Sequence, residues 1–86
     1  MSTSDDLPVE WSVIEAEGLV RVFPMDSFRE GLQLTMLTAQ AAEAVGYAPE
    51  ISWSKEKVII TIPLDSDGLS YQLAHTIESM LHDASR

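Results

Sequence analysis

The pattern of hydrophobic and polar positions changes several times along the chain, and its first part consists of two short apolar segments. Trp11–Ala16 and Leu19–Phe23 are rich in β-branched and aromatic residues, which is typical of short strands. Glu17-Gly18 lies between them and suits a tight turn, so the two segments predict a β-hairpin. Pro24 has no backbone N–H to give to a neighbouring strand and is expected to end the second one.

A helical period follows the hairpin. Ser27 and Glu30 have the spacing of a capping box, and Gly46 with Pro49 beyond it predicts where the helix ends. Its apolar positions fall on two adjacent faces. One face carries Phe28, Leu32, Met36, Ala39 and Glu43, and the next carries Leu34, Leu37, Ala41 and Val45. An apolar arc of this width predicts a helix that is covered by more than a sheet alone.

A second hairpin and a second helix complete the pattern. Ile51–Ser54 and Lys57–Ile62 are predicted strands, joined by a polar turn at Lys55-Glu56. Asp65-Ser66-Asp67-Gly68 has the composition of a loop, and Ser70 is expected to cap the last helix. The apolar stripe of that helix is Leu69, Leu73, Ile77, Met80, Leu81 and Ala84. The order ββαββα predicts an α+β fold, a four-stranded antiparallel sheet with two helices on one face.

Composition limits the domain organisation and the cellular setting. The 86 residues, 45% of them apolar, predict one small domain over residues 11–86, preceded by a flexible polar segment over residues 1–10. The absence of cysteine excludes disulfides and thiolate metal sites. No apolar run is long enough for a membrane span, and Met1–Glu10 is unlike a secretory signal, so we expect a cytoplasmic protein.

Charge excludes one class of partner and favours another. The formal net charge is −9, and the few Lys and Arg residues are scattered among acidic ones. This field repels a phosphate backbone, so nucleic acid is not an expected partner. An acidic surface either serves solubility or steers the protein toward a basic patch on another protein.

The elements from Trp11 to Leu81 carry a recognisable set of motifs. They are Trp11 at the first strand, Phe23 and Phe28 at the helix entry, Ala41-Ala42-Glu43, Pro49-Glu50, the strand Lys57–Ile62, Gly68-Leu69-Ser70 and Leu73-Ala74. In this order and spacing the chain resembles the pterin-4a-carbinolamine dehydratases. The resemblance implies their α+β fold. It also implies a homodimer in which two sheets join edge to edge, which would cover the open edges of a small sheet.

The chain departs from that family at the catalytic positions. Tyr47 and Ala48 stand where the family has two adjacent histidines, and Asp65 stands where it has a third. In the family these imidazoles supply the acid–base chemistry that removes water from the pterin, which needs groups with pKa values near neutrality. A tyrosine, an alanine and one carboxylate do not replace them. We therefore expect no catalytic residue, no metal and no cofactor.

Other side chains remain candidates for binding. Tyr47 and Trp53 could stack on a flat heterocycle, or simply pack at the boundary of helix and sheet. Glu50, Asp65 and Asp67 are acidic positions beside the degenerate site. His75, Glu78 and His82 share one side of the last helix, but without a second ligand cluster they indicate a solvent-exposed polar face rather than a metal site.

Two classes of function follow from these observations. In the first, the fold is kept as a protein-interaction module without catalysis. The resemblance offers a precedent, a dehydratase-like protein of α-carboxysomes that lacks the catalytic residues and assists Rubisco assembly. In the second class, the chain is a dehydratase or a pterin-binding protein with a repurposed pocket formed by Tyr47, Trp53 and Asp65.

Overall fold

A computed structural model describes residues 10–84 of the chain, and the predicted flexible segment over residues 1–10 lies almost wholly outside that range. The elements are β1 (Ser12–Ile14), β2 (Gly18–Pro24), α1 (Phe28–Val45), β3 (Glu50–Trp53), β4 (Lys57–Ile62) and α2 (Leu69–Ala84). The predicted ββαββα order is therefore confirmed. Neither helix in the described range combines the length and the apolar composition needed to cross a membrane.

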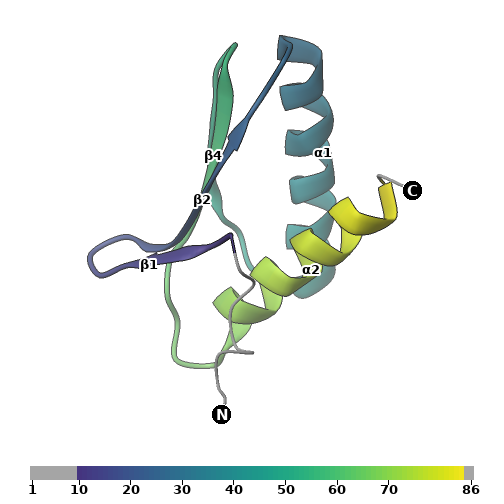
Figure 1. The fold of residues 1–86 in the computed structure, drawn as a ribbon. Helices are drawn as coiled ribbons and strands as arrows, with labels where there is room; N and C mark the ends of the chain where they lie inside the picture. The colour runs from purple at the N-terminus through teal and green to yellow at the C-terminus, as the bar shows by residue number, and fades with distance from the viewer. Residues whose placement is uncertain (1–9, 85–86) are drawn as a thin grey trace.

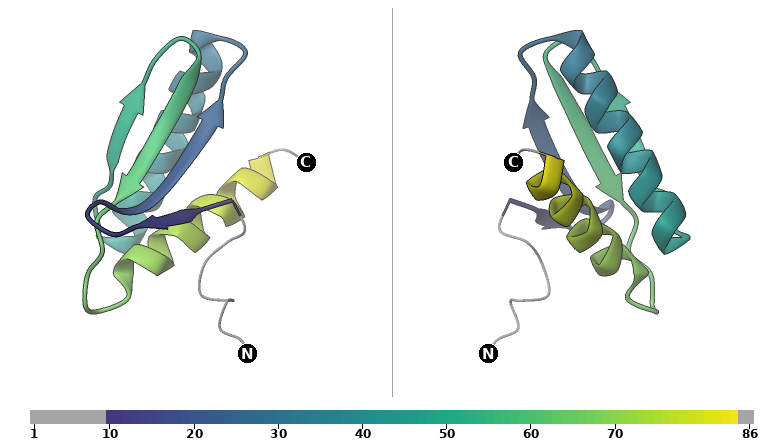
Figure 2. Two further views of the ribbon diagram at one scale, coloured as in Figure 1. Left: turned by 60° about the vertical axis from the view of Figure 1, so that its left-hand side comes forward. Right: turned by 90° about the vertical axis from the view of Figure 1, so that its right-hand side faces the viewer.

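The strands form one antiparallel sheet in the order β1-β2-β4-β3. Both helices lie on the same side of this sheet (Figure 1), and the rotated views show the other face uncovered (Figure 2). The long central seam joins β2 to β4, from Leu19 opposite Ile62 to Pro24 opposite Lys57. The fold is thus a two-layer α+β sandwich, as the sequence predicted.

The core lies between the sheet and the helices. Alternate residues of β4 are buried, because successive side chains of a strand point to opposite faces. The buried hydrophobic residues are Trp11, Leu19, Phe23, Leu34, Ala41, Val58, Ile60, Ile62, Leu73, Ala74 and Ile77. Trp11 was predicted to open the first strand, but it lies just before β1 and is nevertheless buried.

The first hairpin differs from its predicted bounds. The strand expected over Trp11–Ala16 is shorter, and the turn covers residues 15–17, closed by a 2.8 Å hydrogen bond from the Glu17 N–H to the Ile14 carbonyl. Gly18 is the first residue of β2 rather than part of the turn. Its φ of 117° lies in the left-handed region that favours glycine, and a Cβ there would lie 2.1 Å from the Ile62 carbonyl oxygen.

The predicted boundaries of α1 are confirmed. Ser27 is the N-cap and its hydroxyl accepts a hydrogen bond from the Glu30 N–H, while Gly46 ends the helix with a φ of 81°. The Glu30 carboxylate accepts from the Asp26 N–H, one residue before the position that a capping box would use. As its wide apolar arc predicted, α1 packs against both the sheet and α2, but the face carrying Phe28, Leu32 and Met36 stays 54%, 42% and 55% exposed.

Candidate functional site

The positions at which the resemblance predicts family histidines, Tyr47, Ala48 and Asp65, lie where the end of α1 meets the link from β4 to α2. Tyr47 follows the Gly46 C-cap, and its phenol O–H donates to the Pro63 carbonyl at 2.5 Å. This hydrogen bond connects the loop after α1 to the end of β4. The phenol that replaces a family histidine therefore has a partner within the fold itself.

Asp65 is held in the same region as a helix cap. Its Oδ1 accepts from the Ser70 N–H at 2.9 Å, and its Oδ2 accepts from the N–H groups of Leu69 and Asp67 at 3.1 and 3.2 Å. These donors are the orphan amides at the start of α2 and in its approach. The prediction that Ser70 caps α2 was wrong, because Ser70 is buried in the first turn and Asp65 takes the capping role.

Tyr47 and Asp65 have pKa values that differ from their ordinary ones. The backbone hydrogen bond from Ser70, followed by those from Leu69 and Asp67, lowers the pKa of the Asp65 carboxyl and outweighs its desolvation. Desolvation and then the negative charge of Asp65 raise the pKa of the Tyr47 phenol above its ordinary value. Ala48 contributes no titratable group. The two pKa values are therefore shifted in opposite directions, and both shifts lead away from neutral pH.

The acidic binding candidates surround this region on separate surfaces. Glu43 lines a shallow hollow of 420 Å³ with Ala39, Ala42, Gly46, Tyr47 and Ala48. Glu50 lies on another hollow of 470 Å³, formed with Ala16, Glu17, Thr61 and Pro63. The side chain of Asp67 is exposed in the loop that Asp65 organises. The carboxylates of Glu43, Glu50 and Asp67 therefore lie around the loops that the Tyr47 and Asp65 hydrogen bonds hold in place.

Trp53 is not part of this cluster. It lies at the far end of β3 from Glu50 and stacks on Phe28 at the start of α1, with ring centroids 4.2 Å apart and planes inclined by 15°. Gly31 leaves room for its indole, because a Cβ there would lie 2.4 Å from Trp53 Nε1. The structure therefore assigns Trp53 to helix–sheet packing, and does not bring it beside Tyr47 and Asp65.

Glu78 has a structural contact that sequence reasoning missed. Its Oε2 accepts a hydrogen bond from Trp11 Nε1 at 2.8 Å and forms an ion pair with Arg21 of β2. The Arg21 guanidinium also lies 4.1 Å from the centre of the Phe23 ring. The sequence did contain a signal for this contact. Arg21 alternates with Leu19 and Phe23 on the inward face of its strand, and a charge that faces a core needs a partner of opposite charge.

The last helix also fails to supply a metal site. The Glu78 carboxylate contacts Arg21 and Trp11, so the prediction of a solvent-exposed polar face was wrong for this residue. The side chains of His75 and His82 are exposed, as predicted. Residues 10–84 contain no group of three His, Asp or Glu side chains placed to hold a metal ion.

The capping role of Asp65 gives a pH-dependent prediction. We expect Asp65→Ala to lower the thermal midpoint at pH 7, because three N–H groups lose their acceptor. Because the pKa of Asp65 is lowered in the folded state, its contribution is complete above the unfolded pKa of about 3.9 and is lost as pH falls through the folded value. Circular dichroism melts between neutral and acidic pH measure the difference.

Asp67→Ala is the matched control for that prediction. It removes a carboxylate from the same loop but keeps the backbone N–H that Asp65 accepts. Its midpoint should stay near that of the unchanged chain at every pH. An equal loss in both variants, or an Asp65→Ala deficit that persists unchanged at acidic pH, would contradict the capping account.

Comparisons with known proteins relate the sequence and the fold of this chain to those of other proteins. No protein-family model matches the chain. The chain is 38% identical over 63 residues to a protein of Alkaliphilus metalliredigens assigned as a pterin-4-alpha-carbinolamine dehydratase, a match that covers 71% of this chain and 56% of that protein. The chain thus spans little more than half the length of this curated relative.

A solved structure shows the same fold. It is the crystal structure of a transcriptional coactivator/pterin dehydratase from Brucella melitensis, with a TM-score of 0.69 and 18% sequence identity. The superposition covers 83% of this chain and 81% of that one. The sequence match supports the resemblance read from the motifs, and the solved structure confirms the fold.

Proposed function

Since the chain is related in sequence and fold to the pterin dehydratases, we propose that it has kept their fold as a protein-interaction module and has lost their chemistry. The observation that carries this proposal is the fate of the catalytic positions. Tyr47 is bonded to the Pro63 carbonyl and Asp65 caps α2, so both groups serve the fold. Their pKa values are shifted away from neutrality, which removes the acid–base pair.

The client that we propose is Rubisco, with the protein acting as an assembly factor in the cytoplasm or at α-carboxysomes. The proposal rests on the likeness to the non-catalytic member of the family that has this role. It is supported by the net charge of −9, because an acidic protein meets basic patches on a client faster, in a salt-dependent way.

A homodimer would strengthen such an interaction. The sheet ends in β1 and β3, whose outer edges pair with no other strand in residues 10–84. Joining two edges about a two-fold axis would cover them and would present each acidic surface twice, which favours binding to a symmetric client. Sedimentation equilibrium at micromolar concentration would contradict the dimer if it showed only a 9.5 kDa species.

Pterin binding remains the second candidate function. It is favoured by the hollow of 420 Å³ beside Tyr47 and Ala48, at the position of the family histidines. A pterin bound there would meet the Tyr47 ring, while Trp53 is too far along β3 to share it. Isothermal titration with a reduced pterin separates this function from protein binding.

Charge reversal beside the former catalytic site tests the interaction function. Glu50→Lys with Asp67→Lys should lower the yield of assembled Rubisco when the protein is co-expressed with a Rubisco operon. The reason is that both carboxylates are exposed and near the closed loop. The matched control is Asp26→Lys with Glu56→Lys, which makes the same charge change at the other end of the sheet. Equal yields with and without the unchanged protein would refute the Rubisco client.

A further inference from the structure

The face of the sheet that carries no helix is apolar where an open face is usually polar. In an antiparallel sheet with one side in water, inward apolar residues normally alternate with outward polar ones. Apart from Gly18 and Lys57, the outward residues of the central strands β2 and β4 are Val20, Val22, Pro24, Ile59 and Thr61. Val22 is 50% exposed, and Ile14 on the neighbouring β1 is 42% exposed. An exposed apolar surface of this kind marks an interaction site.

The strand register arranges the outward residues in rows that cross the sheet. The middle row holds Val22 of β2 and Ile59 of β4, followed by Ser52 of β3. The next row, toward the turn between β3 and β4, holds Pro24 and Lys57. Two residues along a strand separate neighbouring rows, which places the rows about 7 Å apart. The apolar centre of the face is therefore bordered by a lysine on one side.

A carboxylate borders the face on the other side. The row there holds Val20 of β2, Thr61 of β4 and Glu50 of β3. A hollow of 470 Å³ opens beside this row, and its lining residues are Ala16, Glu17, Glu50, Thr61 and Pro63. The hollow is lined by two carboxylates and by no Lys or Arg, so it suits a cationic side chain.

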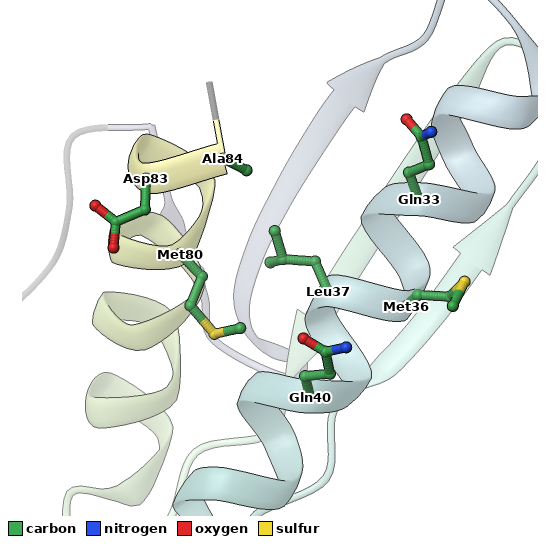
Figure 3. Close-up of a pocket in the computed structure, with 7 residues that line it drawn as sticks. All are labelled: Gln33, Met36, Leu37, Gln40, Met80, Asp83 and Ala84. Carbon is green, nitrogen blue, oxygen red and sulfur yellow. The ribbon is translucent and has the colours of Figure 1, made fainter. Parts of the chain in front are cut away.

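The charge of this face favours a second copy of the chain as its partner. Its outward strand residues include one lysine, Lys57, and one glutamate, Glu50, so the face is neutral although the chain has a net charge of −9. A copy therefore meets no net repulsion there, and the face lacks the basic residues that an acidic membrane attracts. The hollow in which Figure 3 shows Leu37 and Met80 pointing toward one another is formed by the helices alone, so it belongs to the opposite layer.

A two-fold axis that runs along the middle row makes the apolar centre complementary to itself. This rotation places each strand over the same strand of the second copy and reverses the order of the rows. Val22 and Ile59 then meet their own counterparts at the axis, and Val20 meets Pro24 of the second copy. The apolar residues of both copies would be buried against one another, as between the sheets of a β-sandwich.

The same rotation brings the two charges of the face together. It places Lys57 over Thr61 of the second copy, beside Glu50 in the same row and next to the hollow that Glu17 lines. The contact forms twice, because each residue of a two-fold interface meets its partner in both directions. The strand register therefore gives this face charge complementarity toward its own copy.

We propose that the open sheet face binds the same face of a second copy, with Val22 and Ile59 at the axis and Lys57 of each copy beside Glu50 of the other. The two sheets would lie about 10 Å apart, with their strands inclined by about 30°. This contact differs from edge pairing, which joins two sheets side by side and leaves both faces open. Where both contacts form, the assembly is a dimer of edge-joined dimers.

The size of the face sets the expected affinity. Strands of six residues in a sheet of four strands give a face of about 20 by 20 Å. This area is well below the value of about 800 Å² that each partner buries in a standard interface. We therefore expect the two faces to associate in the micromolar range or more weakly.

Charge variants test the contact by sedimentation equilibrium of the purified chain, from about 1 μM to about 1 mM. Lys57→Glu and Glu50→Lys should each raise the dissociation constant about tenfold or more, because each places like charges opposite one another. The two changes combined restore opposite charges without changing the net charge, so the dissociation constant should return to within about threefold of its original value. Arg29→Glu is the matched control, since it makes the same charge change as Lys57→Glu at an exposed position on α1 and should have an effect below about twofold.

Cross-linking tests the position of the axis. The chain has no cysteine, so Val22→Cys introduces a single thiol at the centre of the face. Because packed sheets lie about 10 Å apart, a short bis-maleimide rather than a disulfide should link two copies. Leu64→Cys, at an apolar residue that is 46% exposed outside the strands, should not be linked. Adding Lys57→Glu to Val22→Cys should abolish the link, which an edge contact would leave unchanged.

Four results would contradict the face contact. The first is a mass that Lys57→Glu leaves unchanged, and the second is an equal loss caused by Arg29→Glu. The third is a combined variant that associates no better than the single ones, and the fourth is equal linking of the Val22 and Leu64 thiols. None of these measurements includes a client, so the face contact and the proposed Rubisco function stand or fall separately.

Discussion

The purified protein is expected to dehydrate 4a-hydroxytetrahydropterins at least about a hundredfold more slowly than a family member with its histidines intact. Positioned general acids and bases contribute about 10² to 10⁴ in rate, and this chain offers none with a pKa near neutrality at that place. The Tyr47 phenol is a weaker acid than usual and the Asp65 carboxylate is a weaker base. Stopped-flow absorbance with freshly generated substrate measures the rate.

Two measurements control that result. The family member should be assayed in the same buffer, and the uncatalysed rate should be subtracted, because the substrate also dehydrates spontaneously. Tyr47→Phe should leave any residual rate unchanged, since the Tyr47 phenol already donates to the Pro63 carbonyl. A rate within about tenfold of the intact enzyme would refute the loss of catalysis.

Gly18→Ala is expected to have the largest effect on stability. The methyl group would lie 2.1 Å from the Ile62 carbonyl oxygen and 2.9 Å from the Pro63 Cα, both backbone atoms that cannot move aside cheaply. The residue also has a φ of 117°, which a residue with a Cβ rarely adopts. Strain of about 1–3 kcal/mol and overpacking of about 1–3 kcal/mol act together here. Urea unfolding followed by circular dichroism measures the loss.

Gly68→Ala supplies the matched control. Gly68 has a φ of 83°, yet a Cβ there would have nothing within 4 Å, so only the backbone strain applies. A small domain is stable by about 0.05–0.15 kcal/mol per residue, so Gly18→Ala should remove a large part of the free energy of unfolding, and its urea midpoint should lie well below that of Gly68→Ala. Equal midpoints for the two variants would show that β2 and β4 can separate without cost.

The fold was predictable because local pattern and tertiary structure agree. Val58, Ile60 and Ile62 alternate in β4 and are all buried, and Ser27 and Gly46 bound α1 as their chemistry requires. The first hairpin was less predictable. Composition alone allowed the turn to be shifted by one residue in either direction. Gly18 belongs to β2 because its backbone lies close to Ile62, a residue far along the chain.

The site was predictable only in outline. The sequence indicated that Tyr47, Ala48 and Asp65 replace three imidazoles, but not that Asp65 accepts from three N–H groups at the start of α2. A carboxylate five residues before Ser70 reaches it only because the intervening loop folds back. The sequence placed Tyr47 and Trp53 at one pocket, but Tyr47 precedes β3 while Trp53 is the last residue of that strand.

The strand order β1-β2-β4-β3 also has a consequence for how the chain folds. The outer pairs β1–β2 and β3–β4 are local hairpins that close through short turns. The central seam pairs residues as far apart in the chain as Leu19 and Ile62, so its formation closes a loop that contains α1. Closing such a long loop lowers the conformational entropy of the chain before the strand contacts form and offset that cost. We therefore expect the seam, rather than either hairpin, to set the folding rate, and the chain to fold more slowly than a helical bundle of its size.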